Sequence, residues 1–112
     1  MKTLYVSDLD GTLLNADAEL SSYTVETLNR LISSGAYFSV ATARTAATTL
    51  FILEDVKVNV PIILMNGVLV YDIQSRQYIK KEVLSRTLTA QITAAIKKTG
   101  QNGLMYAVQG NE

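Results

Sequence analysis

One short segment, residues 3–12, limits what this chain can fold into more than any other part of it. It begins with an apolar run at positions 4–6, of the kind that forms a strand inside a parallel sheet, and then becomes acidic. Open α/β folds bind their ligands at the carboxyl edge of such a sheet. Because Asp8 and Asp10 directly follow the run, we expect the chemistry of the protein to take place at these two residues.

The spacing of the two acids indicates what they can bind. Residues two apart on an extended chain point to the same side, so Asp8 and Asp10 can converge if the strand geometry continues through Leu9. The repulsion between two close carboxylates is relieved by a shared proton or by a divalent cation, which for oxygen ligands favours Mg²⁺. Gly11 allows a sharp turn that brings backbone amides near an anion. The segment therefore suits a phosphate group with Mg²⁺, although Asp and Gly also simply close turns.

Composition excludes several classes of function. The 112 residues are 48% hydrophobic and 18% charged, which is consistent with one globular domain or part of one. Ten basic and ten acidic side chains cancel, so the charge balance predicts no nucleic-acid or membrane partner. Cysteine and histidine are both absent, which rules out disulfides and every mechanism that needs a catalytic or metal-binding histidine. Acid and base catalysis then falls to carboxylates.

The amino terminus has no recognisable targeting segment. Its apolar run is too short for the core of a signal peptide, and no apolar run elsewhere reaches membrane-spanning length. We therefore expect a cytoplasmic protein.

The next part of the chain is typical of a β-α-β unit. Ser21 or Ser22 can cap a helix, and Gly35 is a natural stop for it. The apolar residues between them keep helical spacing: Val25, Leu28, Leu31 and Ile32. Positions 36–41 then predict a second strand, parallel to the first because such crossovers return to the same sheet.

The second strand ends in polar residues on the same carboxyl edge as the two acids. Thr42, Ala43 and Arg44 follow it, and a helix is predicted from there to about Glu54, with Leu50 and Leu53 in the core. The side chains at this strand end either contact a ligand or serve only the fold. In the second case Thr42 or Thr45 caps the helix, and Arg44 is solvated.

A third apolar strand, predicted at 62–65, leads to Asn66 and Gly67, and a hairpin follows over 68–71 and 77–81. Asn66 and Gly67 fit a turn with positive φ and, as an alternative, a ligand contact. We expect Asp8, Asp10, Thr42 and Asn66 to lie at the ends of adjacent strands around one cleft, with the first strand inside the sheet.

The last part of the chain predicts a helix over 86–99, capped by Ser85 and ended by Gly100. Positions 104–108 are apolar enough to predict one more strand.

The motif at 8–12, Asp-Leu-Asp-Gly-Thr after an amino-terminal strand, resembles the first motif of the haloacid dehalogenase-like phosphohydrolases. The resemblance implies that Asp8 is the nucleophile, which forms an aspartyl-phosphate. Asp10 would protonate the leaving oxygen and later activate the water. The Asp8 carboxylate and the Asp10 carbonyl oxygen would bind Mg²⁺, so that Asp8 and Asp10 are also the metal residues.

Two further stretches are similar to the same family, in its type II capped, Cof-like sugar-phosphatase branch. Thr42 stands where the family's second motif has its hydroxyl residue, and Ala43 replaces the glycine of an Ala-Thr-Gly-Arg form. Asn66 and Gly67 before an apolar stretch also match this branch. The resemblance implies substrate contacts by these five residues: Thr42, Ala43, Arg44, Asn66 and Gly67.

The fold that this resemblance implies is α/β, a Rossmann-like three-layer sandwich with a parallel sheet. Residues 1–82 would form the amino-terminal part of the family's core, and residues 83–112 would begin an inserted α+β cap. The expected function is a Mg²⁺-dependent phosphatase acting through the aspartyl-phosphate on a small phosphorylated metabolite such as a sugar phosphate.

The family's catalytic lysine and its later acidic motif have no match in the sequence, so we expect these 112 residues by themselves to be an incomplete and inactive piece of the enzyme. The alternatives are a non-catalytic phospho-acceptor or binding module and an inactive scaffold with the same fold.

Overall fold

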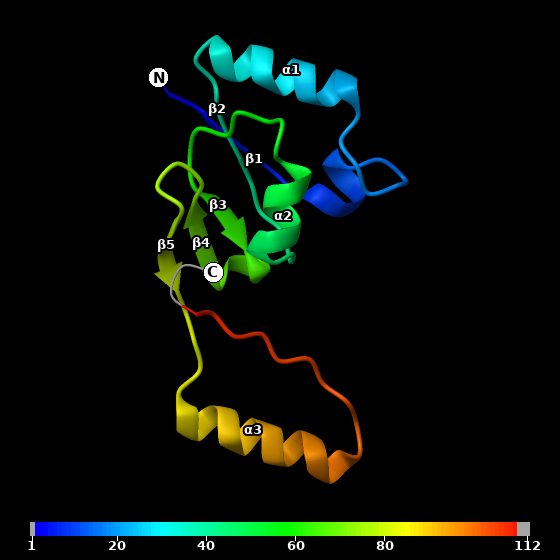
Figure 1. Cartoon of the computed structure of the whole chain (residues 1–112), viewed down its shortest axis with the longest axis vertical. Coiled ribbons are helices and arrows are strands. Elements are labelled where there is room, and N and C mark those ends of the chain that lie inside the picture. The colour runs from blue at the N-terminus through cyan, green and yellow to red at the C-terminus, as the bar shows by residue number, and fades with distance from the viewer. Residues whose placement is uncertain (1, 110–112) are drawn as a thin grey trace. The chain divides into compact units, whose positions relative to one another are not determined.

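The computed structural model describes residues 2–109, in which strands and helices alternate up to β3, and two further strands and a helix follow. The elements are β1 (Leu4–Ser7), α1 (Ser22–Ser33), β2 (Tyr37–Val40), α2 (Ala46–Ile52), β3 (Ile62–Leu64), β4 (Leu69–Asp72), β5 (Gln77–Lys81) and α3 (Arg86–Thr99) (Figure 1). The chain divides into two units, residues 1–81 and 82–112. The assignment of residues 1–82 to a core and 83–112 to a cap stays a prediction.

In the first unit, strands that are neighbours in a sheet are also consecutive along the chain. β1 and β2 are parallel, with Leu4 opposite Tyr37 and Ser7 opposite Val40, and β3, β4 and β5 form an antiparallel sheet. A parallel bridge between Ala41 and Ile63 joins the two sheets just beyond the end of β2. β1, β2 and β3 therefore run in the same direction and end at one edge, which confirms the predicted α/β fold with a parallel sheet.

The first strand was predicted to lie inside the sheet, but among the residues that the structure describes it does not. β1 pairs there with β2 alone and forms the edge of the sheet. Its apolar side chains are largely accessible, with exposed fractions of 54% for Leu4, 60% for Tyr5 and 46% for Val6. The apolar run predicts a strand with neighbours on both sides, but no described strand pairs with the second edge of β1.

The core of the first unit is formed by β2, β3 and β4 together with the segments that follow β1 and α2. Leu9, Val40, Ile62 and Leu64 have no exposed surface, and Leu9 sits between the two acids of the motif. Burial of Leu9 therefore anchors the loop that carries both carboxylates.

The two helices of the first unit bury less than their sequences predict. Leu53, just after α2, is buried as expected, whereas Leu50 is half-buried. On α1 no residue is fully buried, and Leu31 is 49% exposed. The helical spacing is correct, but helical spacing does not show how much of the apolar stripe a short sheet can cover.

Specific contacts fix the ends of helix α1 and the start of β2. Ser21, one of the two predicted caps, accepts a hydrogen bond from the Thr24 amide at 3.1 Å, and Gly35 ends the helix region with φ of 106°. Asn59 holds the start of β2, because its Oδ1 accepts from the Phe38 amide and its Nδ2 donates to the Ala36 carbonyl oxygen. These bonds satisfy backbone groups that the short strand leaves unpaired.

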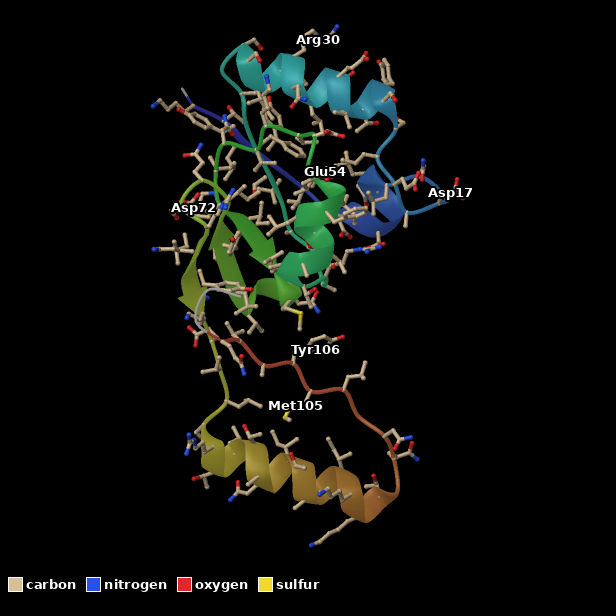
Figure 2. The ribbon with its side chains drawn as sticks, viewed as in Figure 1. Asp17, Arg30, Glu54, Asp72, Met105 and Tyr106 are labelled. Carbon is tan, nitrogen blue, oxygen red and sulfur yellow. The ribbon has the colours of Figure 1, made fainter. Side chains whose placement is uncertain are left out.

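The second unit contains α3, which has the predicted bounds. Ser85 accepts from the Leu88 amide at 3.1 Å, and Gly100 closes the helix with φ of 70°. The strand predicted over 104–108 is wrong, since this segment is irregular, and Met105 and Tyr106 within it are exposed (Figure 2). An apolar run forms a strand only when another strand pairs with it, and none of the described strands does so here. No helix within residues 2–109 has the length and apolarity to cross a membrane.

Candidate active site

A cleft of about 400 Å³ lies at the carboxyl ends of β1, β2 and β3. Its lining residues are Asp8, Asp10, Ala41, Thr42, Ala43, Ile63, Asn66 and Gly67. The structure therefore brings together the four residues expected at adjacent strand ends. Of the seven predicted site residues, it leaves only Arg44 outside the lining.

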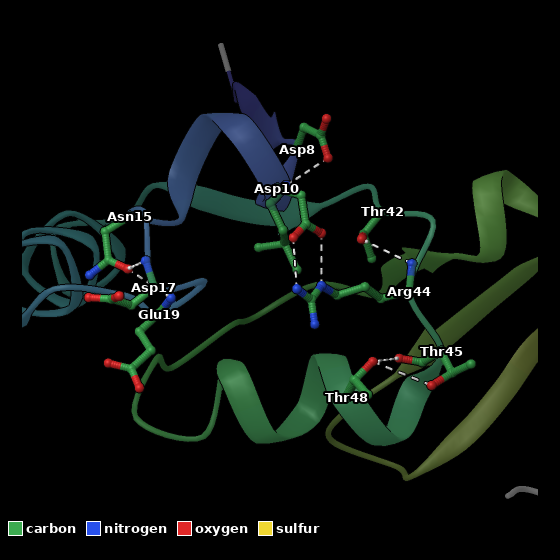
Figure 3. Close-up of polar contacts among 10 residues, drawn as sticks. Asp8, Asp10, Asn15, Asp17, Glu19, Thr42, Arg44, Thr45 and Thr48 are labelled. Atoms are coloured by element: carbon green, nitrogen blue, oxygen red, sulfur yellow. Dashed lines mark hydrogen bonds and ion pairs between the residues drawn. The ribbon is translucent and has the colours of Figure 1, made fainter.

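The loop after β1 separates the two carboxylates. Asp8 keeps an extended backbone, and its Oδ1 accepts a hydrogen bond from the Leu9 amide at 2.7 Å. Leu9 then begins a turn, Leu9–Leu13, which is closed by a bond from the Leu14 amide to the Leu9 carbonyl oxygen. Because the extended geometry stops there, the Asp8 and Asp10 carboxylates point apart and do not converge (Figure 3). Gly11, at φ of 75°, makes the turn possible.

Asp10 instead meets Arg44, from the loop after β2. Arg44 Nε donates to Asp10 Oδ2 at 2.8 Å, and Nη2 donates to Oδ1 at 2.7 Å (Figure 3). These hydrogen bonds from Arg44 lower the pKa of Asp10 and favour its carboxylate form. The alternative in which Arg44 is merely solvated is therefore wrong.

Thr42 is held firmly at the centre of the strand edge. Its side chain is nearly buried, and its Oγ1 accepts a hydrogen bond from the Arg44 amide at 3.1 Å. Its amide donates to the Ile63 carbonyl oxygen at 3.0 Å. Since Oγ1 acts as an acceptor toward Arg44, the hydroxyl proton can be donated to a group in the cleft.

The end of β3 is a tight turn with positive φ angles, as predicted. Met65, Asn66 and Gly67 have φ of 50°, 56° and 93°. The Met65 amide donates to the Arg44 carbonyl oxygen at 3.2 Å. Asn66 and Gly67 thus form a turn and also line the cleft, so the two predicted alternatives are compatible.

The side-chain cap proposed for helix α2 is not formed by Thr42 or Thr45. Thr45 precedes α2 at the capping position, but its side chain makes no capping hydrogen bond. Thr42 bonds within its own loop and does not cap the helix. The capping alternative therefore does not account for Thr42.

The ion pair between Asp10 and Arg44 was not predicted from the sequence. A signal for it exists, because the two residues follow neighbouring parallel strands and carry opposite charges. Strand ends at one edge lie close together, so a charged residue after each is a candidate pair.

The donors in the cleft fit Mg²⁺ in kind. The Asp8 carboxylate and the Asp10 carbonyl oxygen are hard oxygen ligands of the type that Mg²⁺ prefers. Within residues 2–109, however, no group of three or more acidic side chains could hold a metal ion. Asp8 and Asp10 alone would therefore supply only part of the ligands that a Mg²⁺ ion needs.

The parallel sheet, whose carboxyl edge carries Asp8, Asp10 and Thr42, places the chain in the α/β class of proteins. Residues 5–111 match the family model of the haloacid dehalogenase-like hydrolases. The chain belongs to this family, as the motif at 8–12 predicted.

Individual relatives agree with this assignment. The chain is 34% identical over 96 residues to a Buchnera aphidicola protein named as a phosphatase, with 79% of this chain and 36% of that protein covered. It is 33% identical over 84 residues to a 5-amino-6-(5-phospho-D-ribitylamino)uracil phosphatase of Bacillus subtilis, with 75% of this chain and 27% of that protein covered.

Solved structures show the same fold. A haloacid dehalogenase-like hydrolase from Bacteroides thetaiotaomicron matches with a TM-score of 0.78 and 25% identity over 89% of this chain and 39% of that one. A structure from Thermotoga maritima matches with a TM-score of 0.72 and 30% identity over 88% of this chain and 37% of that one. The chain thus spans less than two fifths of the length of these relatives.

Proposed function

We propose that this chain carries the nucleophile and the acid-base residue of a phosphatase that hydrolyses a small phosphorylated metabolite through an aspartyl-phosphate. The observation that carries the proposal is the cleft, in which Asp8, Asp10, Thr42 and Asn66 meet at the ends of three parallel strands. The family supports phosphate ester hydrolysis as the reaction.

The chemistry divides into two displacements at phosphorus. In the first, an Asp8 carboxylate oxygen bonds to phosphorus, the bond to the ester oxygen breaks, and the leaving oxygen takes a proton from Asp10. In the second, water attacks phosphorus, Asp10 accepts a proton from the water, and the bond to Asp8 breaks to release inorganic phosphate. Thr42 would donate its hydroxyl proton to a phosphoryl oxygen, since its Oγ1 already accepts a hydrogen bond from the Arg44 amide.

Magnesium is the cofactor that the donor set favours. The Asp8 carboxylate and the Asp10 carbonyl oxygen would hold it, and when bound it would offset the negative charges of Asp8 and the phosphoryl group. Ala43, Asn66 and Gly67 would line the phosphoryl site.

The substrate class is a phosphate monoester of a small alcohol, such as a sugar phosphate. The name of the Bacillus subtilis relative specifies a phosphorylated ribitylamino compound, which is in keeping with this class. We keep the cytoplasm as the proposed setting, because small phosphorylated metabolites are its constituents.

The test is the activity of Asp8→Asn in the protein expressed from its complete reading frame, assayed with Mg²⁺ and p-nitrophenyl phosphate. We expect turnover to fall to background, because an amide is far too weak a nucleophile to form the acyl-phosphate. Asp17→Asn, which changes an exposed acid in the following loop, is the matched control and should keep wild-type activity. Substantial turnover by a pure Asp8→Asn preparation would contradict the proposal that Asp8 is the nucleophile.

A further inference from the structure

We propose that Arg44 is a positioning residue. It holds the Asp10 carboxylate in the orientation in which Asp10 accepts a proton from the attacking water, and it does not itself bind the phosphoryl group. This inference rests on the proposed function, because it assigns a second residue to the same reaction. The resemblance to the family implied instead that Arg44 contacts substrate.

The geometry of the pair is that of a rigid clamp. Nε and Nη2 lie on one edge of the guanidinium, and they bind the two Asp10 oxygens at 2.8 and 2.7 Å. A two-point contact between planar groups fixes both the position of the carboxylate and the orientation of its plane. A lysine could reach the carboxylate but would leave its plane free to rotate.

Both ends of the clamp are anchored in the backbone. The Arg44 amide donates to Thr42 Oγ1, and the Arg44 carbonyl oxygen accepts from the Met65 amide, which ties the residue to the ends of β2 and β3. Asp10 follows Leu9, which is fully buried. The clamp therefore joins two loops that are each already fixed, as a positioning contact requires.

The location of Arg44 also argues against a direct phosphoryl contact. Asp10 lines the cleft, whereas Arg44 is absent from its lining. The guanidinium edge formed by Nε and Nη2, which could grip an oxyanion side-on, is already occupied by Asp10. The pair is partly exposed, at 28% for the Arg44 side chain and 55% for that of Asp10, so its loss should hardly affect folding.

The two roles predict different kinetics with p-nitrophenyl phosphate. Its leaving group departs without a proton, so formation of the aspartyl-phosphate does not need Asp10, whereas hydrolysis of this intermediate does. Loss of positioning should therefore slow the second step alone. Loss of a phosphoryl ligand should slow the first step and weaken the binding of inorganic phosphate.

The experiment compares wild type, Arg44→Ala, Asp10→Asn and the double variant, each expressed from the complete reading frame with Mg²⁺. For Arg44→Ala we expect kcat to fall roughly 10- to 100-fold with kcat/KM within about threefold, because misplaced general bases lose rate on this scale. Rapid mixing should show a burst of p-nitrophenolate, and mass spectrometry after acid quench should show phosphorylated Asp8. Arg44→Ala should add less than about twofold in the Asp10→Asn background, since the two residues act as one unit.

Arg30→Ala is the control, because it removes the same charge from the exposed side of α1 (Figure 2). It should behave as wild type, and the thermal unfolding of Arg44→Ala should match that of wild type. A lower kcat/KM together with weaker inhibition by inorganic phosphate would overturn the inference in favour of direct phosphoryl binding. An unchanged kcat would overturn it outright.

The failure of the proposed function would look different. In that case Asp8 would not become phosphorylated in any variant, or the wild type would show no turnover, and the inference would fall with it. If Asp8 is phosphorylated in wild type but the kcat losses of Arg44→Ala and Asp10→Asn are additive in the double variant, the inference is wrong and the proposed function stands.

Discussion

The Asn66 amide donates a hydrogen bond to the Thr42 carbonyl oxygen at 3.1 Å, which ties the turn after β3 to the end of β2. The Thr42 amide in turn donates to the Ile63 carbonyl oxygen. The backbone of Thr42 is therefore held by β3 on one side and by the turn after β3 on the other, so its hydroxyl has a fixed place in the cleft.

This fixed hydroxyl leads to a prediction for Thr42 variants of the complete protein. Thr42→Ala should lower kcat/KM roughly 10- to 100-fold, because one hydrogen bond to the phosphoryl group is lost in the transition state. Thr42→Ser keeps the hydroxyl on the same backbone and should stay within about fivefold of wild type. Steady-state kinetics check both, with Thr48→Ala on α2 as an exposed control. Equal losses for the serine and alanine variants would show that the methyl group matters and the hydroxyl does not.

The ion pair predicts the pH behaviour of Asp10. The hydrogen bonds from Arg44 lower the pKa of Asp10 in the folded protein. A lowered folded-state pKa stabilises the fold above the unfolded-state pKa, and this contribution disappears as the pH falls through the folded-state value. For an exposed pair the contribution is small. The same bonds oppose protonation, so proton donation by Asp10 requires the pair to open.

NMR titration of the carboxyl carbons measures this shift directly. In Arg44→Ala the pKa of Asp10 should rise toward its ordinary value. Asp72 serves as an internal control, because the Ser75 hydroxyl lowers the pKa of Asp72 independently of Arg44. A pKa of Asp10 that does not change in Arg44→Ala would mean that the pair is not formed in solution.

Thr49 on α2 offers a prediction for stability. Its side chain is fully buried, and its Oγ1 has no hydrogen-bond partner among the described residues. Thr49→Val replaces the hydroxyl by a methyl group of similar shape and removes a buried polar group that costs roughly 1–3 kcal/mol. We therefore expect a higher free energy of unfolding by about 1 kcal/mol in urea titrations. Thr48→Val, on the exposed side of the same helix, should change it by less than about 0.5 kcal/mol.

Local signals in the sequence were sufficient for much of the fold. Ser85 and Gly100 bound α3 as predicted, because capping depends on a few neighbouring residues. The placement of Asp8, Thr42 and Asn66 around one cleft also followed from the sequence, since parallel strands end at a common edge.

What failed depends on contacts between distant segments, except for the turn at Leu9, which is local. The strand predicted over 104–108 lacks a partner strand among the described residues, which its own sequence cannot reveal. The convergence of Asp8 and Asp10 failed because Leu9 starts a turn, and the pairing of Asp10 with Arg44 depends on where two separate loops meet. Roles for these site residues stay predictions until the variants are measured.

The exposed edge of β1 predicts that the 112-residue chain associates with itself. A strand that offers unpaired backbone groups and accessible apolar side chains is a template for another strand, and Tyr5 is 60% exposed at this edge. Sedimentation velocity should show mass increasing with concentration. Tyr5→Lys should shift the chain toward monomer, because charges would then lie opposite each other in a paired edge. Tyr23→Lys makes the same change on α1, where the side chain is 76% exposed, and should leave association unchanged. A wild-type chain that stays monomeric at every concentration, or equal effects of the two lysines, would contradict pairing through β1.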